Sequence, residues 1–127
     1  MSKKVIESKA AKAIGPYSLG IDANDYVFLS GQIPLDGATG KLVEGGIEAQ
    51  TEQVFRNIKA LLDAAGLTYA HVVKATVFML DLKEFAAMNA IYEKHVTKPY
   101  PARSTIQVAG LPMGARVEIE MLAKRSI

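Results

Sequence analysis

The chain has 127 residues, the usual length of one domain, and we treat residues 1–127 as a single domain. Its 15 basic and 13 acidic residues nearly balance, which argues against a dedicated nucleic-acid binder, because such proteins concentrate basic residues on one face. The absence of cysteine excludes disulfides, a thiolate zinc site and a cysteine nucleophile, and fits a reducing cytoplasm. We find no secretory signal and no apolar run near the about 20 residues that span a bilayer, so a cytoplasmic protein without membrane contact is expected.

The first half of the chain predicts short strands followed by one long helix. Val5–Ile6 and residues 26–32 (YVFLSGQ) are rich in β-forming residues. From Ile47 to Ala65, apolar residues recur at the spacing of one helix face. Gly66 then offers the left-handed conformation that ends many helices. We therefore predict a helix that begins near Ile47 and stops at Gly66.

The second half predicts a strand, a helix and two further strands. Residues 72–80 (VVKATVFML) are apolar at nearly every position, which indicates a covered central strand. Asp81 and Glu84 have the spacing of a helix-capping pair, and the helix that follows continues to His95 or Val96. The last strands are predicted at residues 103–108 and 116–122. The order β-β-α-β-α-β-β favours an α+β fold, with two helices packed on one face of a mixed sheet.

Arg103 is the main candidate for a functional residue. It begins a strand directly after Pro99-Tyr100-Pro101, and proline fixes its own φ and extends the residue before it. The backbone therefore arrives at Arg103 with little freedom. A guanidinium held in this way suits a carboxylate, to which it donates two parallel hydrogen bonds. The alternative is an ordinary surface ion pair on a strand.

The last two strands each alternate between apolar and polar residues. The first places Arg103, Thr105 and Gln107 on one side and Ser104, Ile106 and Val108 on the other, and the second places Arg116, Glu118 and Glu120 opposite Val117, Ile119 and Met121. We predict that the apolar sides face the helices. Arg103 and Glu118 would then share the opposite side. That side is either wetted by solvent or lines a cavity or subunit contact.

Four further residues are candidates with an ordinary structural alternative. Tyr17 follows a Gly-Pro turn, where its phenol could donate to a ligand or cap local backbone. Ser30 and Gly31 lie within a strand, where a glycine often marks a bulge or a close approach. Asn89 borders the apolar stripe of the second helix. The two histidines lack metal-ligand spacing, so no metal site is predicted.

Five stretches of the chain form a recognisable pattern: Ile14-Gly15-Pro16-Tyr17-Ser18, Phe28-Leu29-Ser30-Gly31-Gln32-Ile33-Pro34, the Gln50 to Leu62 helix with Phe55-Arg56-Asn57, Pro101-Ala102-Arg103-Ser104, and Val117-Glu118-Ile119-Glu120. Taken together, these stretches resemble the reactive intermediate deaminase A family, also called the RidA or YjgF family. The resemblance runs along nearly the whole chain and keeps the order of the motifs. The combination of Pro-Ala-Arg-Ser with an upstream Ser-Gly-Gln is its most specific part.

The resemblance implies a chorismate-mutase-like α+β fold and a homotrimer. In that family, sheets from three subunits close a central barrel, and a cleft lies at each subunit interface. The implied reaction is that of a 2-iminobutanoate/2-iminopropanoate deaminase. It hydrolyses enamine or imine acids such as 2-aminoacrylate and 2-aminocrotonate, which leave pyridoxal-phosphate-dependent dehydratases. The products are 2-oxo acids and ammonia, and no cofactor is implied.

By this resemblance, Arg103 binds the substrate carboxylate and Glu118 positions or activates water. Tyr17, Ser30, Gly31 and Asn89 line the cleft. An imine carbon is already electrophilic, so a base and a placed water suffice. We expect a neighbouring arginine to keep the pKa of Glu118 low, which favours orienting water over removing its proton.

One position departs from the family pattern: many members carry cysteine where this chain has Thr105. Threonine can hydrogen-bond water or substrate but is a poor nucleophile without an adjacent base.

The sequence leaves two other functions open. The cleft could bind 2-oxo acids as a regulatory protein without turnover, or the chain could act on RNA, as ribonucleases or translation inhibitors among its relatives are described to do. The near-neutral charge and the lack of an aromatic stacking strip argue against RNA.

Overall fold

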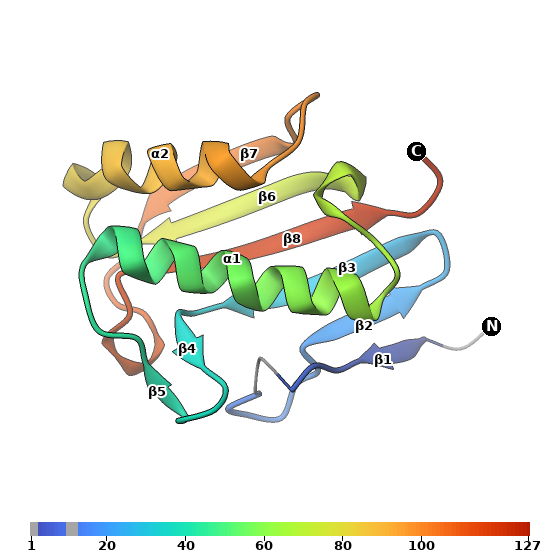
Figure 1. Ribbon diagram of the computed structural model, residues 1–127, viewed down its shortest axis with the longest axis horizontal. Coiled ribbons are helices and arrows are strands. Elements are labelled where there is room, and N and C mark those ends of the chain that lie inside the picture. Colours follow the sequence, from blue (N-terminus) through green and yellow to red (C-terminus); the bar gives the residue numbers. More distant parts are fainter. Residues whose placement is uncertain (1–2, 10–12) are drawn as a thin grey trace.

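The computed structural model describes residues 3–9 and 13–127. A mixed sheet with the strand order β1-β2-β3-β8-β6-β7 is covered on one face by two helices (Figure 1). Its strands are β1 (Lys4–Ile6), β2 (Gly20–Ala23), β3 (Tyr26–Gln32), β6 (Val72–Met79), β7 (Ala102–Gln107) and β8 (Val117–Lys124), and the helices are α1 (Ile47–Ala64) and α2 (Phe85–His95). β6 and β7 pair in parallel, and the other pairs of this sheet are antiparallel. The predicted α+β arrangement with two helices on one face is confirmed.

Helix α1 forms and ends as its sequence predicts. Its apolar stripe is buried against the sheet, and Val54, Ile58 and Leu61 are completely covered. At its end, Gly66 adopts φ +74°, and the N–H of Leu67 donates to the carbonyl of Leu62 at 2.8 Å. This bond satisfies a carbonyl that the last turn leaves unpaired.

The start of α2 differs in one respect from the prediction. Asp81 caps a short 3-10 helix, Leu82–Glu84, by accepting a hydrogen bond from the N–H of Lys83 at 2.9 Å. α2 continues directly from this turn. Glu84 does not complete a capping box, because its carboxylate instead binds Arg116 at 2.6 Å. The spacing of Asp81 and Glu84 therefore predicted the helical turn correctly. It did not predict that the Glu84 carboxylate binds Arg116, which lies far away in the sequence.

Several short strands escape the sequence prediction. β2 pairs with both β1 and β3, although three of the four residues in GIDA are weak β-formers, so pairing with its neighbours supports its conformation. A separate hairpin joins β4 (Leu35–Asp36) and β5 (Lys41–Leu42) around the predicted Asp36–Gly37 turn. Short 3-10 helices also form at Tyr69–His71 and Pro112–Gly114. The hairpin and the two 3-10 helices leave the arrangement of two helices on one face of the sheet unchanged.

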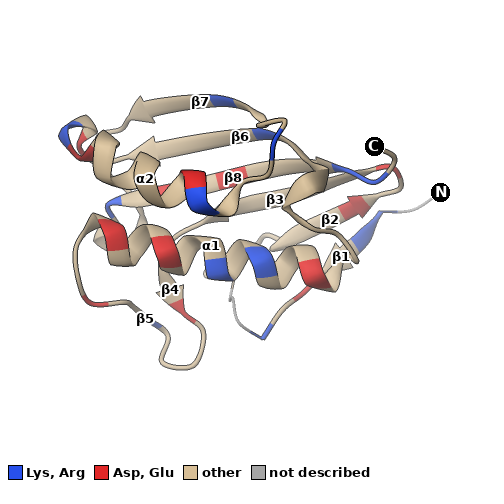
Figure 2. Cartoon of the chain, turned by 45° about the horizontal axis from the view of Figure 1, so that its top comes forward, with Lys and Arg blue, Asp and Glu red and all other residues tan. Residues whose placement is uncertain are grey.

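The sheet face opposite the helices is open in the single chain. It carries apolar side chains, among them Phe28 with 51% and Ile106 with 45% of its surface exposed. Figure 2 shows residues of both charges interspersed along α1 and acidic residues on β8. Among the helices of the described chain, none is long and apolar enough to cross a membrane.

Candidate active site

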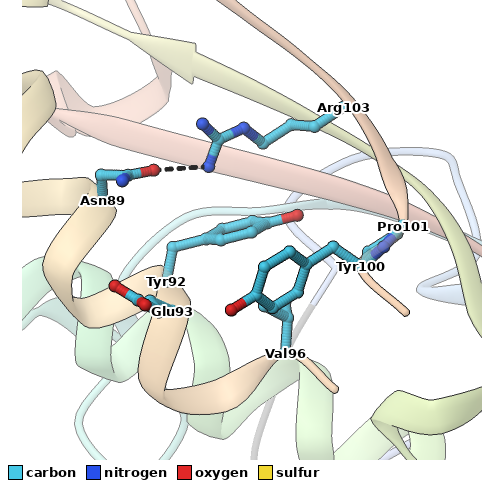
Figure 3. A pocket seen from close by; sticks show the side chains of 7 residues that line it. All are labelled: Asn89, Tyr92, Glu93, Val96, Tyr100, Pro101 and Arg103. Carbon is cyan, nitrogen blue, oxygen red and sulfur yellow. Dashed lines mark hydrogen bonds between the residues drawn. The ribbon is translucent and has the colours of Figure 1, made fainter. Parts of the chain in front are cut away.

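Arg103 projects from β7 toward helix α2. Its Nη1 donates a hydrogen bond to Oδ1 of Asn89 at 2.8 Å (Figure 3). Arg103 is the second residue of β7 and follows the segment that contains Tyr100 and Pro101, so the backbone of the strand fixes where its side chain begins. The amide of Asn89 then fixes where the guanidinium ends. The sequence candidates Arg103 and Asn89 are therefore brought together.

Two aromatic rings complete the surroundings of the guanidinium. The Cζ of Arg103 lies 4.5 Å from the ring centroid of Tyr92 and 5.5 Å from that of Phe85. Among the described residues, Arg103 forms no ion pair with a carboxylate. An arginine held by an amide and two rings keeps its positive charge available, since these neighbours attract the cation without neutralising it. This arrangement suits an anionic ligand.

A cavity of about 470 Å³ opens beside Arg103, between α2 and the start of β7. Its lining combines the guanidinium, an amide and the Glu93 carboxylate with aromatic and aliphatic walls, and a few polar groups among apolar walls are usual in a small-molecule site. The lining residues are Asn89, Tyr92, Glu93, Val96, Tyr100, Pro101 and Arg103 (Figure 3). Burial raises the pKa of the Tyr92 hydroxyl, and the Arg103 charge acts in the opposite direction.

Glu118 lies in a different part of the chain, against β3. A Cβ built on Gly31 would overlap the carboxylate of Glu118 and approach its Cδ to 2.8 Å. Glycine at position 31 therefore makes room for this side chain. Burial, and then the charge of Glu120, raise the pKa of the Glu118 carboxyl. Among the described residues no arginine lies beside Glu118, so a single chain does not supply the arginine neighbour from which we expected a low Glu118 pKa.

Tyr17 and Ser30 belong to the Glu118 side of the sheet. The Ser30 hydroxyl donates to the carbonyl of Ser18 at 2.6 Å, and the Tyr17 hydroxyl accepts a hydrogen bond from the N–H of Ile14 at 3.3 Å. Tyr17 also shares a very small cavity with Gly31. The candidates from the sequence thus form two clusters, one around Arg103 and Asn89 and one around Glu118.

The prediction that Arg103 and Glu118 share a sheet face is wrong. Ala75 on β6 pairs with Arg103 on one side and with the buried Met121 on the other, and paired residues share a face. Arg103 therefore lies on the helix face. Phe78 in turn pairs with Glu118 and with the exposed Ile106, which places both of these on the open face.

The error arises at β7, where the polar side of the strand faces the helices. β7 is an edge strand, and its helix-facing residues meet the polar Asn89 of α2 rather than the centre of the core. Thr105 lies on this same side, and its buried hydroxyl has no hydrogen-bond partner among the described residues. Ser104 and Ile106, predicted to face the helices, lie on the open face.

Tyr92 and Phe85 of α2 are site residues that the sequence analysis did not identify. The sequence contained a signal for these two residues, because they stand three residues after and four residues before Asn89, on the same helix face.

Across residues 3–9 and 13–127, no cluster of three or more histidine, aspartate or glutamate residues could hold a metal ion.

Comparison with known proteins gives the family of this chain. Residues 7–125 match the family model described as Endoribonuclease L-PSP. The chain belongs to the RidA/YjgF family.

Members of the RidA/YjgF family match the chain over nearly its full length. It is 50% identical to Protein DfrA of Myxococcus xanthus, with 97% of this chain and 96% of the relative aligned. It is 45% identical to the 2-iminobutanoate/2-iminopropanoate deaminase of Salmonella typhimurium, over 98% of this chain and 99% of the relative. The crystal structure of RidA from a Psychrobacter species superimposes with a TM-score of 0.91 at 43% identity, covering 95% and 98% of the two chains. The family includes proteins named as deaminases and as endoribonucleases.

Proposed function

We propose that this protein hydrolyses reactive 2-imino acids and their enamine tautomers to 2-oxo acids and ammonia. The observation that carries the proposal is the Arg103 guanidinium, held beside a cavity and without an ion-pair partner among the described residues. A guanidinium in this state binds a small carboxylate through charge-assisted hydrogen bonds. Relatives with deaminase names, aligned over nearly the whole chain, support the same reaction.

The reaction needs an acid–base group in addition to the anion site. Water attacks C2 of the imine, a C–O bond forms, and the π electrons of the C=N bond move to nitrogen. The two protons of that water pass in turn to the nitrogen, the C–N bond breaks, and ammonia leaves as the carbonyl forms. The Glu118 carboxyl is the group that we propose for these proton transfers, and within one chain burial raises its pKa.

Arg103 and Glu118 lie on opposite faces of one sheet, so one chain does not place both against one substrate. We propose that they meet between protomers of a homotrimer, Arg103 from one protomer and Glu118 from its neighbour. The open sheet face, with exposed Phe28 and Ile106, supports burial against other subunits. Tyr17, Ser30 and Gly31 would line this shared cleft together with Glu118. We propose that the protein acts in the cytoplasm.

The proposal is tested by coupling the protein to a pyridoxal-phosphate-dependent serine or threonine dehydratase and following 2-oxo acid formation. Arg103→Ala is expected to lower the protein's acceleration by about 10²–10⁴-fold, because it removes two hydrogen bonds to a charged group. Arg56→Ala is the matched control, since Arg56 is an exposed arginine on α1. An Arg103→Ala trimer that accelerates the reaction like the wild type would refute the assignment.

A further inference from the structure

Tyr92 carries a buried polar group that the proposed reaction does not yet use. Only 5% of the residue is exposed, and its hydroxyl has no hydrogen-bond partner within the described chain. Its ring lies directly beneath the guanidinium of Arg103, with the centroid 4.5 Å from Cζ (Figure 3). We propose that Tyr92 is a positioning residue, whose ring holds Arg103 in the orientation that binds the substrate carboxylate. This inference rests on the proposed function.

We attribute the positioning of Arg103 to the ring of Tyr92. A cation over an aromatic face is attracted by the ring's negative face and keeps its full charge. A carboxylate in the same place would neutralise the guanidinium and compete with the ligand. The hydroxyl, in contrast, is buried without a partner, which costs free energy rather than supplying it. Phenylalanine at position 92 should therefore preserve the function.

The Tyr92 ring is itself fixed from the helix layer. It meets Phe55 of α1 edge-on, with centroids 5.7 Å apart and an interplanar angle of 77°. Phe55 stacks on His95 of α2 at 4.6 Å and 10°, and His95 is bound to Glu52. Aromatic pairs of these geometries are stabilising. The orientation of Arg103 is therefore set by packing between α1 and α2, and not only by the strand that carries it.

The position of Arg103 can be measured without any substrate. In wild-type protein, the ring current of Tyr92 should shift the NMR signals of the Arg103 side chain upfield. Tyr92→Phe should keep this shift, whereas Tyr92→Leu should remove most of it. Tyr69→Leu is the control for damage to the aromatic cluster, because Tyr69 contacts Phe55 at 5.7 Å without touching Arg103. It should leave the Arg103 signals unchanged.

The functional consequence is measured by calorimetry with 2-oxobutanoate as the probe. Tyr92→Leu is expected to weaken binding about 3- to 30-fold, while Tyr92→Phe stays within about twofold of wild type. In an Arg103→Ala background, Tyr92→Leu should cause no further loss, since it acts only through the guanidinium.

The outcomes separate this inference from the proposed function. Wild-type binding by Tyr92→Leu, an equal loss in Tyr92→Phe, or a loss that persists without Arg103 would overturn the role of the Tyr92 ring. An unshifted Arg103 signal in the wild type would overturn it as well. Equal binding by wild type and Arg103→Ala would instead overturn the anion site, and with it the proposed function.

Discussion

Replacing Asn89 with aspartate changes the charge beside Arg103 and leaves the shape of the side chain almost unchanged. The Oδ1 of Asn89 accepts a hydrogen bond from Nη1 at 2.8 Å, so the Asn89→Asp carboxylate occupies the same place and keeps the contact. The guanidinium would then be paired within the chain. A structural arginine should become more firmly held, whereas an anion-binding arginine should lose its ligand.

The size of the effect follows from the geometry. A ligand carboxylate on the free edge of the guanidinium would lie about 6 Å from the new carboxylate, and the repulsion at an effective dielectric constant of about 20 is about 3 kcal/mol. Arg103 is only partly buried, so solvent screening reduces this to about 1–2 kcal/mol. Asn89→Asp should therefore bind 2-oxobutanoate about 5- to 30-fold more weakly than wild type.

Calorimetry at two salt concentrations checks this reasoning. The difference between Asn89→Asp and wild type should shrink as salt rises, because part of the repulsion crosses solvent. Asn89→Ala is the control: it loses the hydrogen bond but keeps the net charge, so its defect should be smaller and insensitive to salt. If Asn89→Asp binds 2-oxobutanoate as tightly as wild type, the free positive charge of Arg103 does not bind the carboxylate of the ligand.

Three further substitutions test other parts of the structure. Gly31→Ala should displace the Glu118 carboxylate and lower kcat at least about tenfold with little change in KM, and it should add no loss to Glu118→Gln; additive defects would contradict this. The His95 hydrogen bond lowers the pKa of Glu52 below 4.5, so the pair stabilises the fold above about pH 4.5 and loses this contribution as pH falls through the lowered value. Glu52→Gln should therefore show a flatter fall of Tm in acid than wild type, and parallel curves would rule the effect out. Thr105→Val removes a buried hydroxyl without a partner and should leave Tm unchanged or raise it by up to about 4 °C; a clear fall in Tm would show that the hydroxyl is satisfied in the assembled protein.

Local patterns in the sequence were sufficient for the helices and the longer strands. The apolar stripe of α1 and the stop at Gly66 depend on residues within one element, and so does the cap at Asp81. β2 was missed because its residues carry little strand preference and its pairing partners lie on either side of it. Tertiary contacts stabilise such strands, and local sequence patterns carry no information about these contacts.

The sequence by itself determined that Arg103 stands at the start of a strand and that Glu118 alternates with apolar residues on another. Only the tertiary structure decided that these two side chains point to opposite faces of the sheet. Alternation along a strand shows which residues share a side, but not which side meets the helices. That choice depends on the register with β6 and on Asn89, Tyr92 and Phe85, which α2 brings over the edge strand to hold the guanidinium.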